Sequence, residues 1–217
     1  MAASGRKSAL TQTRIMDAAA SVLGRRGYAG TRLTDVAREA GLQPPAIYYY
    51  FDSREALVEA VMVAGVRQMR EHLETVLDAL DAGTDALGRL LLAVEEHLRH
   101  ELDISDYMTA SIRNAGQVPP SIQEAKRAED LRYGRLWRTL VHDALPPGRR
   151  EVERDVLFTQ MLVLGALNWT AEWWDDERAD LDALVVHARG FVRAAIEGPA
   201  PALTGPGPGA TGDAAPG

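Results

Sequence analysis

Apolar residues recur at helical spacing along most of the chain, and glycine, proline and polar residues interrupt them. From Leu10 to about Arg26 the apolar positions follow one another at intervals of three and four residues. Gly27 ends this helix, and Thr31 is placed as the N-cap of a second, short helix that ends just before Gly41. No segment alternates apolar and polar residues between turn signals, as a half-buried strand would. The pattern therefore predicts an all-α protein.

Two prolines open the third predicted helix. Pro44 and Pro45 are tolerated in a first helical turn because the amides there have no acceptor within the helix. After a break, Ser53 is placed as the N-cap of a long helix that runs to about Leu80. Further helices reach to about residue 197, separated by breaker-rich segments at 81–86, 115–121, 145–150 and 173–180.

Composition divides the chain into four parts. Residues 1–9 are small, polar and basic, which predicts a flexible arm. Residues 10–57 hold the first three helices, and residues 58–197 hold the remaining six. Residues 198–217 are almost wholly Gly, Pro, Ala and Thr, and such a segment cannot bury enough apolar surface to order itself.

Charge is distributed unevenly along the 217 residues. The formal net charge is −7, yet residues 1–54 hold eight Lys and Arg against four acids, which gives +4, and the remainder carries −11. This asymmetry indicates two units with different partners, although chance scatter of surface charge is the alternative.

The absence of cysteine excludes disulfides, thiolate nucleophiles and cysteine-based metal sites. The N-terminus has no apolar core of signal-peptide length, and no apolar run is long enough to span a bilayer. We therefore expect a cytoplasmic protein without a membrane partner.

Three consecutive tyrosines follow the two prolines. Successive side chains on a helix point about 100° apart, so Tyr48, Tyr49 and Tyr50 fan over roughly 200° and cannot all enter one core. With Ile47, Phe51 and, in part, Tyr50 facing the core, Tyr48 and Tyr49 should face outward. A short helix, a glycine-bearing turn and a second helix form the layout of a helix-turn-helix, in which such tyrosines can contact phosphates and base edges. The alternative is that Tyr48 and Tyr49 only cover the surface of the helix and contact no DNA.

Residues Thr11 to Leu57 resemble the N-terminal domain of the tetracycline-repressor (TetR) family, in the run T-x-T-R-I-M-D-A-A…L-G-R-R-G-Y-A-G-T-R-L-T-D-V-A-R-E-A-G-L…I-Y-Y-Y-F-D-S-R-E-A-L. The resemblance implies a three-helix DNA-binding domain, followed here by a six-helix ligand-binding and dimerisation domain. It also implies a homodimer that represses a palindromic operator on double-stranded DNA until a small ligand binds. The DNA-contacting positions that it implies are Thr31, Arg32, Gln43, Pro44, Pro45, Ala46, Tyr48, Tyr49 and Arg54.

This chain departs from the family pattern at the start of the third helix. Gln43 takes a cap position where the family often has Ser or Thr, and the two prolines after it leave few donors for base recognition. Sequence selectivity should therefore depend on Gln43, on Tyr49 and on the shape of the DNA. Arg54 stands where the family usually has a phosphate-binding lysine.

The segment 155–176 is the most apolar helix in the chain. Together with the last helix it could form half of a four-helix bundle that a second subunit completes. Two recognition helices must meet half-sites about one DNA turn apart, which a two-fold dimer provides. Intramolecular packing is the alternative. The interface residues that we expect are Leu157, Met161, Leu164, Gly165, Leu184, Ala188 and Phe191.

Three of the four tryptophans lie close together near the end of this segment. Such a cluster could line an apolar cavity with a few polar anchors, although an ordinary aromatic core is the alternative. The run N-W-T-x-E-W-W-D at 168–175 resembles a segment of TetR-family regulators of lipid and steroid catabolism, and this implies an acyl-CoA thioester or polycyclic effector and no further cofactor. The candidate ligand-binding residues are Met62, Met69, Met108, Trp137, Asn168, Trp169, Glu172 and Trp173.

His97, His100 and Glu101 are near neighbours on one predicted helix and could suggest a metal or acid–base site. Their spacing is not H-E-x-x-H, no third ligand is evident and the segment is polar, so we expect a solvated helix face with no metal and no catalytic residue. An all-α enzyme using the C-terminal pocket is a remote alternative. The other alternative is a regulator that binds no ligand, or an activator of transcription. The sequence does not distinguish these from a repressor that is released by a ligand.

Overall fold

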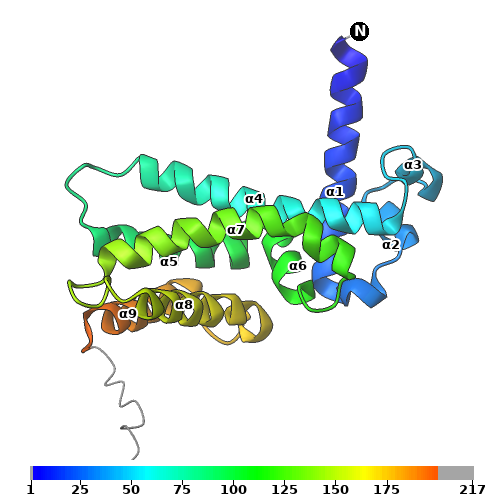
Figure 1. Cartoon of the computed structure of the whole chain (residues 1–217). Helices are drawn as coiled ribbons and strands as arrows, with labels where there is room; N and C mark the ends of the chain where they lie inside the picture. Colours follow the sequence, from blue (N-terminus) through cyan, green and yellow to red (C-terminus); the bar gives the residue numbers. More distant parts are fainter. Residues whose placement is uncertain (1, 200–217) are drawn as a thin grey trace, which may run out of the picture.

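The computed structural model describes residues 2–199, and within this range every regular element is helical (Figure 1). The prediction of an all-α chain with three helices followed by six is confirmed for the described residues. No helix in this range is long and apolar enough to cross a membrane. The elements are α1 (Ala2–Gly30), α2 (Leu33–Glu39), α3 (Pro44–Tyr48), α4 (Arg54–Asp78), α5 (Ala86–Arg99), the π-helical turn η1 (His100–Ile104), α6 (Asp106–Asn114), α7 (Pro120–Ala144), α8 (Glu153–Trp173) and α9 (Leu181–Glu197).

Helix α1 is longer than the sequence predicts. It begins at Ala2, so the stretch expected to be a flexible arm is helical from its second residue, and Figure 1 shows this end of α1 standing away from the body. Apart from Gly5 the stretch lacks a helix breaker, and alanine and lysine favour helix. At the other end, Gly27 has φ 70° and ψ 172°, which kinks the chain where the helix was predicted to stop. Of the predicted tail, residues 200–217 lie outside the described range.

The cap of α2 differs from the prediction. Its N-cap is Arg32, and Thr31 lies one residue outside the helix. Thr31 is buried, and its Oγ1 donates a hydrogen bond to the carbonyl of Gly27 at 2.8 Å. The Thr31 hydroxyl therefore bonds a carbonyl at the kink of α1 and does not cap the first turn of α2.

The starts of α3 and α4 agree with the prediction. Helix α3 begins with Pro44 and Pro45, and Gln43 is its N-cap. Ser53 is the N-cap of α4 and accepts a hydrogen bond from the amide of Ala56 at 3.0 Å. The predicted breaker segments coincide with the connections that follow α4, α6, α7 and α8.

Buried apolar residues form two cores. The first core lies between α1, α2, α3 and the beginning of α4, and Ile15 and Ile47 are fully buried in it. Ala110 of α6 and Ile122 of α7 belong to this core as well. The DNA-binding unit predicted for residues 10–57 therefore completes its core with residues from the second domain.

The second core lies between α4, α5, α7, α8 and α9, and Trp137 is its largest fully buried side chain. Helix α4 contributes to both cores, with Met62 in the first and Met69 in the second. Gly65, between these methionines, lets α6 approach closely, because a Cβ atom here would lie 2.5 Å from the carbonyl oxygen of Tyr107.

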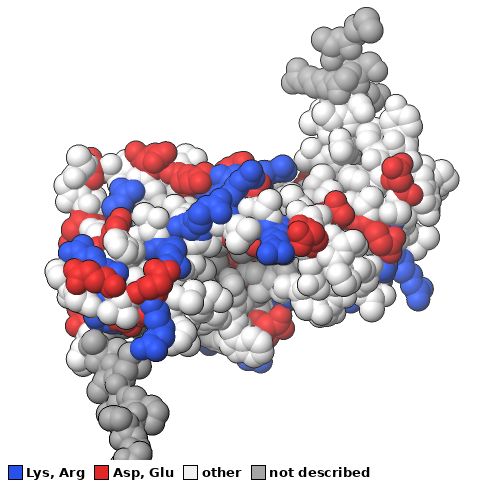
Figure 2. All heavy atoms as spheres, viewed as in Figure 1, with Lys and Arg blue, Asp and Glu red and all other residues white. Residues whose placement is uncertain are grey.

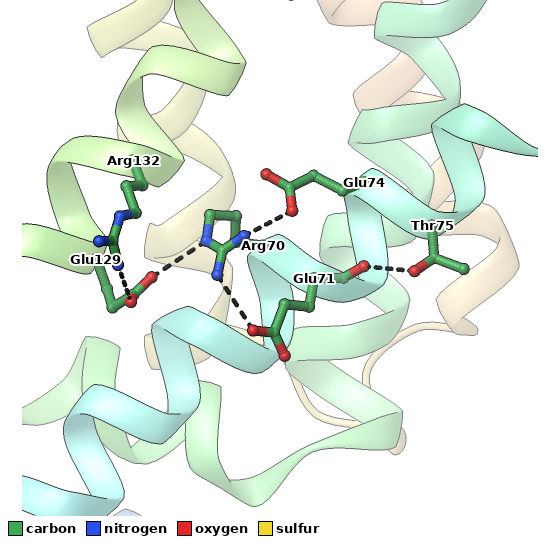
Figure 3. A network of polar contacts seen from close by, with 6 residues as sticks. All are labelled: Arg70, Glu71, Glu74, Thr75, Glu129 and Arg132. Atoms are coloured by element: carbon green, nitrogen blue, oxygen red, sulfur yellow. Dashed lines mark hydrogen bonds and ion pairs between the residues drawn. The ribbon is translucent and has the colours of Figure 1, made fainter.

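A network of ion pairs ties α4 to α7 (Figure 3). Arg70 of α4 donates to Glu129 of α7 at 3.1 Å and to Glu74 at 2.6 Å, and Arg132 donates to Glu129 at 2.6 Å. Although burial alone would raise it, the pKa of Glu129 is lowered, because Arg70 hydrogen-bonds the carboxylate and both arginine charges lie beside it. The network fixes the middle of α4 against α7.

Candidate DNA-binding surface and effector pocket

Helix α3 divides the three tyrosines as predicted. Ile47 and Phe51 are buried in the first core, whereas Tyr48 is 58% and Tyr49 80% exposed. Tyr50 is half-buried, and its ring meets that of Tyr49 edge-on with the ring centroids 5.0 Å apart. The helix is shorter than predicted, because it ends at Tyr48; Tyr49 is its C-cap and keeps helical backbone angles, so the two exposed phenol rings lie at the end of α3.

The start of α3 adds four solvent-facing positions to the two tyrosines. Gln43 and Pro45 are exposed, and Pro44 and Ala46 are half-exposed. We call the six positions together the α3 surface: Gln43, Pro44, Pro45, Ala46, Tyr48 and Tyr49. Pro44 and Pro45 have no amide N–H and the amide of Ala46 donates to the carbonyl of Gln43, so the start of α3 offers side chains more than backbone donors.

Two residues of the predicted DNA contacts are engaged within the protein. Thr31 is only 2% exposed and bonds Gly27, so its hydroxyl is not presented to DNA. Arg54 donates through Nη1 to the carbonyls of Tyr28 at 3.0 Å and Thr31 at 3.3 Å, and its guanidinium carbon lies 4.3 Å from the centre of the Tyr28 ring. Arg54 therefore joins the beginning of α4 to the end of α1. Arg32, by contrast, is exposed.

Exposed arginines surround α2. Arg26 and Arg38 each contact Asp35 at 2.6 Å, and Arg25 lies 3.1 Å from Glu39. Ion pairs at such exposed positions contribute little to stability, so these cations can exchange their carboxylate partners for phosphates.

A pocket of about 480 Å³ lies between α4, α6, α7 and α8. Val66, Met108, Ile112, Met161 and Leu164 make up much of its apolar wall. The polar positions are Ser111, Lys126, Asp130, Gln160 and Asn168. An apolar chamber with a few polar groups is the usual form of a small-molecule site.

Only two of the predicted ligand-binding residues line this pocket. Met108 and Asn168 do so, whereas Met62 is buried in the first core and Met69 and Trp137 are buried in the second. The lining residues that the sequence missed come mainly from α7 and α8, with two more from α6, and Met161 and Leu164 among them were expected at the dimer interface instead.

The predicted tryptophan cavity is wrong. Trp169 is 64% exposed, Trp173 is 41% exposed and Glu172 is also exposed, so none of the three encloses a ligand. The spacing of i and i+4 correctly puts the tryptophans on one face of α8. That face continues the exposed stripe of Phe158 and Leu162 and points away from the pocket.

The outer side of α8 and α9 carries a large apolar surface. Of the predicted interface residues, Leu157, Met161, Gly165 and Phe191 are exposed, whereas Leu164, Leu184 and Ala188 are half-buried against the second core. We call the exposed apolar side chains the α8–α9 face: Leu157, Phe158, Met161, Leu162, Trp169, Trp173, Val186 and Phe191. So many large apolar side chains on one side mark a surface that another molecule covers.

The predicted solvated face at His97, His100 and Glu101 is wrong, because all three residues are buried. His97 Nδ1 lies 2.7 Å from the hydroxyl of Tyr133, and its Nε2 lies 2.9 Å from a carboxylate oxygen of Glu101. The stripe that contains Leu90 reaches His97 after seven residues and Glu101 after eleven, so both fall on the buried side of α5 and its continuation η1. The helical spacing from Leu90 to His97 and Glu101 was the feature of the sequence that could have predicted their burial.

Burial changes the titration of this cluster. It raises the pKa of Glu101 and, together with the nearby charges of His72 and His97, lowers the pKa of His100 to about 4. Within the part of the chain that the structure describes, no group of three His, Asp or Glu side chains is arranged to hold a metal ion.

On the face seen in Figure 2, Lys and Arg alternate with Asp and Glu across the middle of the molecule, where Figure 1 has α4 and α7. Lys126 and Arg127 of α7 line a second hollow of about 420 Å³, which shares Ala115, Lys126 and Asp130 with the apolar pocket. The apolar pocket therefore adjoins a charged vestibule.

Comparison with known proteins agrees with a helix-turn-helix regulator. A family model described as "Bacterial regulatory proteins, tetR family" matches residues 15–61. A second, described as "Tetracyclin repressor-like, C-terminal domain", matches residues 83–178. The chain belongs to the TetR family, whose members are DNA-binding regulators.

Relatives and solved structures extend this similarity over most of the chain. The fatty acid metabolism regulator protein of Bacillus subtilis is 23% identical over 174 residues, which cover 78% of this chain and 87% of that protein. FadR from Bacillus subtilis in complex with stearoyl-CoA has a TM-score of 0.69 at 19% identity, covering 87% of this chain and 99% of that one. AibR in complex with isovaleryl coenzyme A and operator DNA has a TM-score of 0.72 at 16% identity, covering 84% and 97%. The two structures share the fold of this chain.

Proposed function

We propose that this regulator represses transcription in the cytoplasm, binds a palindromic operator as a homodimer, and is released by a hydrophobic effector of the acyl-CoA type. The observation that carries the proposal is the pair of exposed tyrosines, Tyr48 and Tyr49, on the short helix of a net-basic N-terminal unit.

Binding to DNA is supported by the α3 surface and the exposed arginines near it. Phenol hydroxyls can bond phosphates while the rings pack against sugars and thymine methyls. Gln43 supplies an amide that can donate to and accept from a base edge. Because Arg25, Arg26, Arg32 and Arg38 would displace counterions from DNA, affinity should fall steeply as salt rises.

Dimerisation is supported by the α8–α9 face. Two copies of this face could pack as a four-helix bundle about a two-fold axis. Gly165 and Gly190 have open space where a Cβ atom would lie, so a neighbouring helix can approach them closely. Such a dimer would present two α3 surfaces to half-sites about one DNA turn apart.

The effector class is supported by the pocket and by the neighbours. Val66, Met108 and Ile112 offer an apolar wall for an acyl group. The adjoining vestibule holds Lys126 and Arg127, which pair with Asp130 and Glu124 and could exchange these partners for a phosphorylated head group. Two structural neighbours carry stearoyl-CoA and isovaleryl coenzyme A. Release requires that the effector bind the DNA-incompetent state more tightly, since equal affinity for both states would shift nothing.

The test is selection of duplexes from a random library with purified protein, followed by titration of the selected complex with stearoyl-CoA and isovaleryl-CoA. We expect an enriched palindrome and release by one of the thioesters, with free coenzyme A as the control. Absence of enrichment at low salt would contradict operator binding. Enrichment without release would leave the ligand-independent regulator, and enrichment with increased transcription in vitro would identify an activator.

A further inference from the structure

The polar side chains of the pocket between α4, α6, α7 and α8 differ in whether the protein already uses them. Gln160 donates to the carbonyl of Gly134 at 2.8 Å, and the hydroxyl of Tyr133 lies 2.7 Å from Nδ1 of His97. Asn168 differs from both, because its Oδ1 is buried and has no hydrogen-bond partner among the described residues. A buried amide oxygen in this state costs free energy until a ligand or a water supplies a donor.

Asn168 shares the pocket wall with apolar side chains. Leu164 lies one turn earlier on the same side of α8, and α6 contributes Met108 and Ile112. Ser111 of α6 lines the pocket as well and is only 2% exposed. An amide and a hydroxyl are therefore set among side chains that fit an acyl chain.

The charged vestibule lies apart from these two polar groups. The residues that line it all fall between Ala115 and Asp130, at the end of α6 and in the first half of α7. Asn168 and Ser111 line the apolar pocket and not the vestibule. A thioester whose phosphorylated head group occupies the vestibule therefore meets Asn168 and Ser111 with its acyl group.

A saturated acyl group cannot satisfy the amide of Asn168. Beyond its carbonyl it holds only carbon and hydrogen, so it would remove water from the amide and give no hydrogen bond in return. A hydroxyl group donates one hydrogen bond and accepts others. It therefore matches both the amide of Asn168 and the hydroxyl of Ser111.

The spacing along α6 indicates which part of the acyl group is concerned. Ser111 lies about one helical turn, roughly 6 Å, before Ala115 at the border of the vestibule. An extended chain advances about 1.2 Å per bond, so the atoms within about five bonds of the thioester reach the depth of Ser111. A hydroxyl on carbon 3 to carbon 5 of the acyl group falls in this region.

We propose that Asn168 and Ser111 select an effector whose acyl group carries a hydroxyl close to the thioester, so that the ligand is a hydroxyacyl-CoA and not a saturated acyl-CoA. The proposal rests on the proposed function, because it specifies the effector of that site. Asn168 determines the specificity, since its amide is left unpaired by the saturated analogue. Ser111 adds a second, weaker contact.

Isothermal titration calorimetry with the full chain tests this selectivity. The probes are decanoyl-CoA and its 3-hydroxy and 5-hydroxy derivatives, which share one head group and one chain length. We expect the better of the two hydroxylated thioesters to bind at least about tenfold more tightly than decanoyl-CoA, because a buried polar group left unpaired lowers affinity by about this factor. A preference of less than about threefold would overturn the proposal.

Substitution of Asn168 separates recognition from a structural role. Asn168→Leu replaces the amide with an apolar side chain of similar size that favours helix. It should weaken binding of the hydroxylated thioester about tenfold and leave decanoyl-CoA binding unchanged or tighter, so that the preference disappears. Ser111→Ala should weaken only the hydroxylated probe, by about threefold. An equal loss for both probes in Asn168→Leu would show a structural role and overturn the proposal.

A matched control changes an apolar residue of the same wall. Met161→Leu alters α8 within the pocket and should leave the ratio of the two affinities unchanged. Thermal unfolding of each variant is followed by circular dichroism. If Asn168→Leu is unfolded at the assay temperature, Asn168→Ala takes its place with the same expectation, and a preference retained in that variant would overturn the proposal.

Failure of this proposal can be told apart from failure of the proposed function. If decanoyl-CoA binds and releases the operator as well as the hydroxylated thioesters do, the proposed function stands and the selectivity fails. If no thioester binds, the acyl-CoA class is wrong, and the free acids decanoate and 3-hydroxydecanoate decide the selectivity. A preference for 3-hydroxydecanoate that Asn168→Leu abolishes would support it, and equal or absent binding of the two acids would overturn it.

Discussion

The DNA-binding unit, residues 10–57, and the effector domain, residues 58–197, differ in whether their buried polar atoms have hydrogen-bond partners. In the DNA-binding unit the buried polar residue is Thr31, and its hydroxyl bonds the carbonyl of Gly27. In the effector domain, several buried polar atoms have no hydrogen-bond partner with suitable geometry. They belong to His97, His100, Glu101, Ser105, Trp137 and Asn168.

The difference matters because buried polar atoms without a partner can form new hydrogen bonds. Unpaired polar atoms are costly in a packed interior, so each needs an explanation such as a bound water, a ligand or an alternative arrangement. Of these residues Asn168 lines the pocket between α4, α6, α7 and α8. The effector domain thus keeps unused hydrogen-bonding capacity at one pocket-lining position, and no such buried atom occurs among the described side chains of the DNA-binding unit.

The largest effect on stability is expected from a substitution in the second core. Trp137→Ala removes the largest fully buried side chain of the second core and should lower the free energy of unfolding by about 3–5 kcal/mol. Urea unfolding checks this. Trp174→Phe, at a half-buried position beyond α8, is the control and should change stability by less than about 1 kcal/mol. A similar loss for both would mean that the buried Trp137 carries no special packing role.

The buried His100 of the effector domain should make the stability of the protein depend on pH. Because its folded-state pKa is about 4 against an ordinary 6.5, the unfolded chain binds a proton between these values that the folded chain does not. Stability should therefore fall as pH falls from 6.5 to 4, by up to about 3 kcal/mol from this group. Urea midpoints of the His100→Gln variant should fall less steeply over that range. His142→Gln, at an exposed position, should follow the unaltered chain, and parallel curves for all three would contradict the assignment.

A steric change tests the close contact between α4 and α6. Gly65→Ala brings a Cβ atom to 2.5 Å from the backbone oxygen of Tyr107 and should cost about 1–3 kcal/mol, because backbone cannot rotate away. Gly190→Ala, in open space on α9, should be neutral or stabilising, since alanine favours helix. Thermal unfolding of the two variants gives the comparison. A stabilising Gly65→Ala would show that α4 and α6 can separate freely.

The smallest effect in energy concerns the α3 surface. Tyr49→Ala should weaken operator binding about tenfold, since hydrogen bonds to charged groups contribute about 1.5–3 kcal/mol, and it should leave the unfolding midpoint unchanged because Tyr49 is exposed. Tyr107→Phe, whose hydroxyl donates to Asp17 away from α3, is the control for loss of a phenol. Equal operator affinity for Tyr49→Ala and the unaltered chain would remove this residue from the DNA contact.

Local chemistry predicted local structure well. Ser53 and Pro44 were correctly placed at helix starts, because a cap or a first-turn proline depends only on its neighbours in sequence. The outward tyrosines were predictable for the same reason, as helical spacing fixes their directions.

Contacts between distant segments could not be predicted. Arg54 was assigned to phosphate but bonds Tyr28 and Thr31, and Asn114 meets a backbone amide 86 residues away. Periodicity grouped Trp169 with Trp173 correctly, yet it could not tell the pocket side of α8 from the outer side. Which face of a helix is covered depends on the packing of the whole domain.

The shared first core limits how the molecule can be divided. Ala110, Val118 and Ile122 complete a core whose other buried members lie within the first 62 residues, so a fragment that ends after α4 would leave a hole beside α1. We expect such a fragment to be poorly folded alone. Exchange of DNA-binding units between relatives by recombination would therefore have to carry α6 along, or find a recipient whose α6 has a compatible surface.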